Sequence, residues 1–187
     1  MINENYEVAI LSETISLELG IPPDKAWLIR QAALTHDIGK MHIDKRIINK
    51  PGRLTKAEFK IVKTHVNIGA QMLSHLQNPL REIAMTVAKY HHEWADGSGY
   101  LGISTNQLPD YVSIVGIADV YCALIHSRPY KDAWSKEQAF EYLQKQAGTQ
   151  FSHALVNNFI NIVKKGGIRD RPLYSFYKGT ERYRKPN

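Results

Sequence analysis

Cysteine and long apolar runs are both scarce in this chain of 187 residues. Cys122 is the only cysteine, so no disulfide can form within the chain, and we expect a reducing compartment, the cytoplasm. No stretch approaches the roughly 18 consecutive apolar residues that a transmembrane helix needs. The first twenty residues carry four glutamates, which is unlike a secretory signal peptide. The composition therefore predicts neither secretion nor a membrane span.

An excess of positive charge is missing from most of the chain. The net charge is +6, yet residues 1–163 carry sixteen basic and sixteen acidic side chains. Residues 164–187 hold the excess, with eight basic, two acidic and four aromatic residues. We therefore expect residues 1–165 to form one domain that does not bind DNA or RNA. Residues 166–187 are interpreted as a basic, aromatic tail, which could contact phosphate groups but is more simply a solvated terminus.

Alternating apolar and polar residues, which mark half-buried strands, are also absent. Apolar residues recur instead at helical spacing. In the first helix they are Val8, Leu11, Ile15 and Leu19. The same spacing predicts further helices over residues 24–40, 55–76, 80–93, 110–127, 135–147 and 151–165. The predicted fold is an all-α bundle of about seven helices.

Local signals place the ends of these helices. Gly20, followed by two prolines, ends the first helix, and Asp24 is expected to cap the second. Thr55 and Glu58 have the spacing of a capping box. Residues 41–54 lack a clean period and contain Lys-Pro-Gly, which predicts a loop.

Six residues of metal-binding type lie at helix ends or in apolar surroundings. They are His36, Asp37, His65, His91, His92 and Asp119. Singly, each has an ordinary interpretation: His65 as a core histidine, Asp119 as a helix cap or the partner of an arginine. Asp119 is the most informative, because it lies within the apolar stretch IVGIADVYCALI, where an unpaired carboxylate costs several kcal/mol. A metal ion is a partner that would keep it ionised.

Together these residues predict a two-metal hydrolase. Imidazole and carboxylate donors without thiolate suit Fe, Mn, Zn or Ni. Six protein ligands exceed what one catalytic ion with an open position needs. A carboxylate can bridge two ions about 3.5–4 Å apart, which is a known hydrolytic design. The adjacent histidines of HHEWADGSGY fit this site, because a helix that ends there frees the second side chain to turn toward the same ions.

Four segments in this order resemble the HD-GYP family. They are HDIGK (36–40), HVNIGA (65–70), HHEWADGSGY (91–100) and IADVYCALIHSRPYK (117–131). The family is a branch of the HD-domain metal-dependent phosphohydrolases, which are helical bundles, and its usual substrate is the bacterial messenger cyclic di-GMP. The resemblance covers residues 4–165. It implies a phosphodiesterase of second-messenger signal transduction that converts cyclic di-GMP to linear pGpG, GMP or both.

The resemblance also implies a role for each site residue. Asp37 would bridge two divalent ions, Fe or Mn before Zn or Ni, and Lys40 would approach the scissile phosphate, so that Asp37 and Lys40 are the catalytic pair. The metal ligands would be Glu4, His36, Asp37, His65, His91, His92 and Asp119. The substrate would be held by Lys40, Gly99, Tyr100, Arg128 and Lys131.

Three positions depart from the family pattern. Leu101 replaces the proline of the Gly-Tyr-Pro signature, so the loop loses a rigid turn residue. Cys122 replaces an aspartate close to Asp119, and Glu4 replaces the first metal histidine, although glutamate can also ligate Fe or Mn. Two alternatives therefore stay open. One is an HD hydrolase of another nucleotide. The other is a degenerate domain that binds cyclic di-GMP, or a partner protein through the Gly-Tyr-Leu loop, without hydrolysis.

Overall fold

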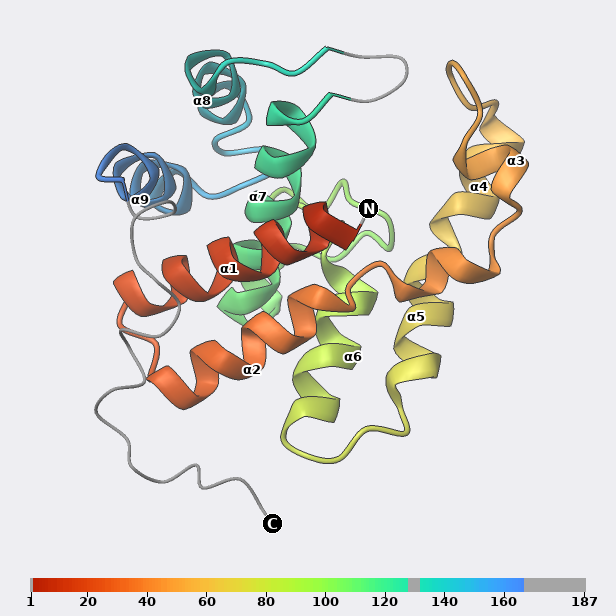
Figure 1. The fold of residues 1–187 in the computed structure, drawn as a ribbon, viewed down its shortest axis with the longest axis horizontal. Coiled ribbons are helices and arrows are strands. Elements are labelled where there is room, and N and C mark those ends of the chain that lie inside the picture. The colour runs from red at the N-terminus through yellow and green to blue at the C-terminus, as the bar shows by residue number, and fades with distance from the viewer. Residues whose placement is uncertain (1, 128–131, 167–187) are drawn as a thin grey trace.

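The computed structural model describes residues 2–127 and 132–166, and these residues form a bundle of helices without β-strands (Figure 1). The α-helices are α1 (Ile2–Glu18), α2 (Pro23–Leu34), α3 (Lys45–Ile48), α4 (Lys56–Lys63), α5 (His65–Leu73), α6 (Leu80–Tyr90), α7 (Asp110–Ile125), α8 (Lys136–Lys145) and α9 (His153–Lys164). Two 3₁₀ helices, η1 (Ile38–His42) and η2 (Thr105–Gln107), lie between them. The predicted all-α class is confirmed.

Helix α7 is the centre of the bundle, and ten of its sixteen residues are buried. Helix α1 packs on both α2 and α7, whereas α8 and α9 lie together beside the C-terminal part of α7 (Figure 1). Tyr121 of α7 contacts the rings of Phe140 and Phe159 at centroid distances of 6.0 and 5.1 Å. None of the helices in the described ranges has both the length and the apolar character needed to cross a bilayer.

The first two helices correct two sequence-based predictions. Leu19 lies beyond the end of α1 and is 38% exposed, whereas Val8 is fully buried as expected. Asp24 does not cap α2, which begins at Pro23 with Pro22 as its N-cap and no side-chain cap. The two prolines set the helical φ angle themselves, and Asp24 falls in the first turn, where an acid still favours the helix dipole.

The predicted helix over residues 55–76 is two helices. The capping box is confirmed, since the Thr55 side chain accepts from the Glu58 backbone and Glu58 bonds back to Thr55. The helical hydrogen-bond pattern is interrupted at Thr64, whose backbone N–H and hydroxyl both donate to the carbonyl oxygen of Ile61. The interruption makes His65 the first residue of α5. In the predicted loop over 41–54, α3 forms a single helical turn.

Two glycines let backbones approach the site histidines closely. Gly39 of η1 lies against α5, and a Cβ there would overlap the carbonyl oxygen of His65. Gly116 of α7 faces the end of α6, where a Cβ would lie 2.9 Å from the carbonyl oxygen of His91. Larger residues at these positions would push η1 and α7 away from the two histidines.

Candidate metal centre

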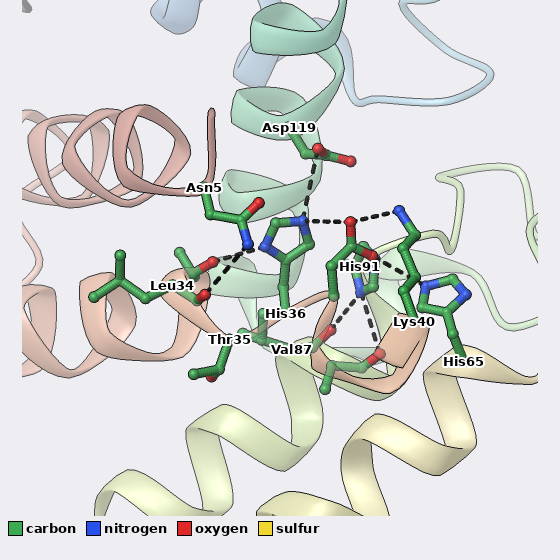
Figure 2. Close-up of polar contacts among 12 residues, drawn as sticks. Asn5, Leu34, Thr35, His36, Lys40, His65, Val87, His91 and Asp119 are labelled. Atoms are coloured by element: carbon green, nitrogen blue, oxygen red, sulfur yellow. Dashed lines mark hydrogen bonds and ion pairs between the residues drawn. The ribbon is translucent and has the colours of Figure 1, made fainter. Parts of the chain in front are cut away.

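The six predicted donors come from four segments and meet at one place. His36 and Asp37 lie in the turn between α2 and η1, His65 begins α5, and His91 and His92 follow α6. Asp119 projects from α7. Figure 2 shows His36, His65, His91 and Asp119 converging, with the Lys40 side chain reaching the same point. The structure therefore brings together residues that are up to 83 positions apart, from His36 to Asp119.

Asp37 lies at the centre and points its two oxygens at different partners. Its Oδ1 is 3.3 Å from Nε2 of His65 and 3.6 Å from Nε2 of His91. Its Oδ2 is 3.4 Å from Nε2 of His36 and accepts a hydrogen bond from Lys40. The same Nε2 of His36 is 3.6 Å from Oδ1 of Asp119. One carboxylate thus joins two groups of donors.

The spacing of these atoms fits ligands of a common ion. Asp37, His65, His91 and His92 each offer one ligand atom, and these atoms lie within 4.8 Å of one another. The histidine-to-carboxylate separations of 3.3–3.6 Å are too long for good hydrogen bonds. Two ligands that each lie about 2.1 Å from one ion are themselves about 3–3.5 Å apart.

Backbone carbonyl groups fix the orientation of three of the histidines. Nδ1 of His36 donates to the Ala33 oxygen at 2.7 Å, and Nδ1 of His65 donates to the Val62 oxygen at 2.6 Å. Nδ1 of His91 donates to the Val87 oxygen at 3.0 Å. Because each Nδ1 donates to a carbonyl group, Nε2 is the ring nitrogen that faces the centre and that would bind a metal ion.

Four buried atoms at the centre have no hydrogen-bond partner. They are Nε2 of His36, His65 and His91 and Oδ1 of Asp37. Buried polar atoms are rarely left unpaired, because the lost hydration costs about 1–3 kcal/mol per group. Four such atoms gathered at one centre form a set that bound divalent cations would satisfy.

Charge at the centre also favours a cation. Burial alone would raise the pKa of Asp37, but His36, His65 and His91 hold that pKa well below its usual value. Burial lowers the pKa of His91, and burial together with the adjacent His91 lowers the pKa of His92 strongly. The lowered pKa values favour an ionised Asp37 beside neutral His91 and His92, which is the protonation state that metal binding requires.

His36 marks where the two carboxylates would hold positive charge. Burial lowers its pKa, but the opposing effects of Asp37 and Asp119 are larger and raise the pKa to about 10. The pKa of Asp119 is lowered, because His36 outweighs the effect of burial. The donor set of nitrogen and oxygen atoms around a buried, negatively charged centre fits one or more divalent metal ions.

Comparison with known proteins agrees with this geometry. The sequence matches the HD domain family over residues 1–155. The chain belongs to the HD domain family. It is 38% identical over 144 residues to the cyclic di-GMP phosphodiesterase response regulator RpfG of Xanthomonas campestris, covering 76% of this chain and 38% of that protein. It is also 37% identical over 150 residues to the 3′3′-cGAMP-specific phosphodiesterase 2 of Vibrio cholerae, covering 80% of this chain and 29% of that protein.

Solved structures with a similar fold also include proteins of this kind. The HDG"Y"P protein Bd1817 from Bdellovibrio bacteriovorus superimposes with a TM-score of 0.71 at 21% identity, covering 87% of this chain and 52% of that one. This HD domain spans less than half the length of the curated relatives described above. The relatives are named cyclic-dinucleotide phosphodiesterases, as the resemblance to the HD-GYP branch predicted.

Two of the three departures from the family pattern, Cys122 and Glu4, lie near Asp119. Cys122 is 2% exposed, and burial, with the charge of Asp119, raises the pKa of its thiol. The Cys122 side chain packs in the hydrophobic core, and its influence on Asp119 stays a prediction. Glu4 of α1 lies close enough to add to that rise in pKa, which places its charge near α7. Its role as a metal ligand stays a prediction.

Of the predicted substrate-binding residues, three are described and two are not. Lys40 lies at the centre, and Gly99 and Tyr100 lie in the loop that follows α6. The Tyr100 ring is 4.4 Å from the His92 ring, and burial, with Asp37 and Asp119, raises its pKa to about 12. Arg128 and Lys131 lie outside the described residues.

Glu93 is a site residue that the sequence analysis missed. It is 3% exposed, and its two carboxylate oxygens accept from the backbone N–H groups of Leu101 and Ile103 at 2.7 and 2.8 Å. The loop is thereby folded back so closely that a Cβ on Gly99 would lie 2.7 Å from the carbonyl oxygen of His92. The available signal was an acid placed directly between a histidine pair and a glycine-rich turn.

Proposed function

We propose that this HD domain hydrolyses cyclic di-GMP in the cytoplasm with two divalent metal ions. The observation that carries the proposal is Asp37, whose two oxygens face separate groups of buried donors without hydrogen-bond partners. A bridging carboxylate of this kind belongs to two-metal phosphoester hydrolysis. The names of the relatives support a cyclic dinucleotide as substrate.

We assign the two oxygens of Asp37 to different ions. Oδ1 would share the first ion with His65, His91 and His92, whose ligand atoms gather on that side. Oδ2 would share the second ion with the remaining predicted ligands, which are His36, Asp119 and Glu4. Iron or manganese fits this mixture of imidazole and carboxylate best, with zinc or nickel as alternatives. When bound, two such ions would make a water molecule nucleophilic at neutral pH and would offset the negative charge of the phosphate.

Lys40 is the described cation nearest the proposed chemistry. Its ammonium donates to Oδ2 of Asp37, while its side chain stays 33% exposed and so remains accessible to a substrate. From there its Nζ would face the scissile phosphate and stabilise the charge that develops on its oxygens. The same Nζ could supply the proton that the leaving sugar oxygen needs. The expected product is linear pGpG, with GMP after a second cleavage.

Binding without hydrolysis is the second candidate function, and Glu4 is the observation that favours it. A carboxylate in place of a neutral histidine would lower the net positive charge of the second metal site and so its ability to activate water. Turnover separates the two functions. Protein purified without oxygen and loaded with Fe(II) or Mn(II) should convert cyclic di-GMP to pGpG, and a chelator should stop the reaction. Tight binding of cyclic di-GMP with no product would establish the second function.

Substrate contacts and metal binding should be separable by mutation. Arg128→Ala is expected to raise the KM for cyclic di-GMP about 10- to 150-fold with metal content intact, because a charge-assisted contact contributes about 1.5–3 kcal/mol. Asp119→Asn should instead lower metal content and turnover. Calorimetry with cyclic di-GMP and elemental analysis of both variants measure these effects. Unchanged affinity in Arg128→Ala would remove this residue from the substrate site.

A further inference from the structure

Helix α4 carries an aromatic side chain toward the metal centre without burying it. None of its residues is buried, and Phe59 is 42% exposed. The Phe59 ring meets the Tyr100 ring edge-to-face, with centroids 5.7 Å apart. Tyr100 in turn contacts His92 at 4.4 Å. A continuous row of rings therefore leads from a predicted metal ligand to the surface.

Lys63 adds positive charge to this row. Its ammonium lies 4.8 Å from the centroid of the Tyr100 ring and 5.1 Å from that of Phe59. Lys63 is one turn of helix beyond Phe59, so both project from the same side of α4. The result is a partly exposed pair of rings with a cation over both of them, beside the proposed site of phosphate cleavage.

We propose that Phe59, Lys63 and Tyr100 form a platform that binds one purine base of the cyclic dinucleotide, with Lys63 selecting guanine. This inference rests on the proposed function. An exposed ring next to a phosphate site provides the stacking surface that a base requires. Guanine offers two neighbouring acceptors, O6 and N7, whereas adenine offers N7 beside an amino donor, so an ammonium group favours guanine.

The stacking step is tested on the metal-loaded full chain with cyclic di-GMP. Phe59→Ala should raise KM and the calorimetric Kd about 5- to 150-fold, which corresponds to about 1–3 kcal/mol, with kcat and metal content unchanged. Phe59→Tyr should restore wild-type values, because it keeps the ring. Ile61→Ala is the matched control, since Ile61 is 45% exposed on the same helix and does not belong to the row of rings.

The outcomes separate this inference from the proposed function. If Phe59→Ala binds cyclic di-GMP as Ile61→Ala does, or if it loses metal and kcat in parallel, the platform is wrong even though the wild type turns over substrate. If the wild type binds cyclic di-GMP without cleaving it, hydrolysis is wrong, and the calorimetric comparison still decides the platform. If the wild type neither binds nor cleaves cyclic di-GMP, both are overturned.

The guanine preference is tested by comparing cyclic di-GMP with cyclic di-AMP. In the wild type the Kd for cyclic di-AMP should exceed the Kd for cyclic di-GMP. Lys63→Met should reduce this ratio by about 5-fold or more, the equivalent of about 1 kcal/mol, while Lys63→Arg keeps the preference. An unchanged ratio in Lys63→Met, whether both affinities fall equally or neither falls, would show that Lys63 does not read the base.

Discussion

At the residue scale, the donors of the site could be predicted but their orientation could not. His36, His65 and Asp119 stand out in the sequence because each is a polar residue in apolar surroundings, where it needs a partner. The Nδ1 atoms of His36, His65 and His91 are protonated because each faces a backbone carbonyl group three or four residues earlier in a folded turn. Such turns at helix ends follow from tertiary packing and are not encoded in residue type alone.

Glu4 is the residue whose role is most open to direct measurement. Glu4→Ala should weaken binding of the second ion, at His36 and Asp119. Binding of the first ion, at His65, His91 and His92, should be unchanged. Elemental analysis should then show the loss of about one ion per chain. Glu4→His is the informative partner, since a rise in turnover of cyclic di-GMP would show that the natural residue attenuates the site. Unchanged metal content and activity in Glu4→Ala would place Glu4 on the surface.

At the scale of elements, close backbone packing sets a boundary that periodicity missed. The apolar spacing runs on through residues 55–76, which is why one helix was predicted. The ladder is interrupted at Thr64, beside the place where Gly39 of η1 meets the His65 backbone. This contact joins segments 26 positions apart, so the spacing within 55–76 carries no trace of it.

The contact between η1 and α5 predicts an asymmetric response to added methyl groups. Gly39→Ala should destabilise the fold by about 3 kcal/mol or more, because its Cβ would overlap the backbone at His65 and the backbone must move. Gly69→Ala is the matched control. Its Cβ would lie 3.3 Å from the Gly39 nitrogen, and the gain in helix propensity offsets this, so we expect a change of less than about 1 kcal/mol. Urea unfolding of both variants measures the difference, and equal stabilities would contradict it.

The loop after α6 should depend on the carboxylate of Glu93. Glu93→Gln replaces one acceptor by a donor and leaves the N–H of Leu101 or Ile103 unpaired, at a cost of about 1–3 kcal/mol in unfolding free energy. The loosened loop displaces Tyr100, so KM for cyclic di-GMP should rise while metal content is kept. Glu82→Gln, on the exposed side of α6, is the control. Identical stability and KM in the two variants would show that the loop does not rely on Glu93.

At the scale of the whole molecule, the site lies where α2, α5, α6 and α7 come together. The sequence predicted this all-α arrangement well because apolar periodicity records which face of each helix is buried. Helices α8 and α9 pack on α7 and contribute none of the six predicted donors. Their contribution is to hold α7, through Tyr121 and its aromatic neighbours, so that Asp119 faces His36.

The central claim, that Asp37 joins two metal sites, is tested most directly by the metal content of Asp37→Ala. The wild type, purified without oxygen and supplied with Fe(II) or Mn(II), should hold about two ions per chain by elemental analysis. Asp37→Ala should lose both ions, because one carboxylate serves both groups of donors. Asp24→Ala, which removes an exposed acid of α2, should keep both. Two ions retained in Asp37→Ala, or fewer than about 0.3 ions per chain in the wild type, would contradict the two-metal account.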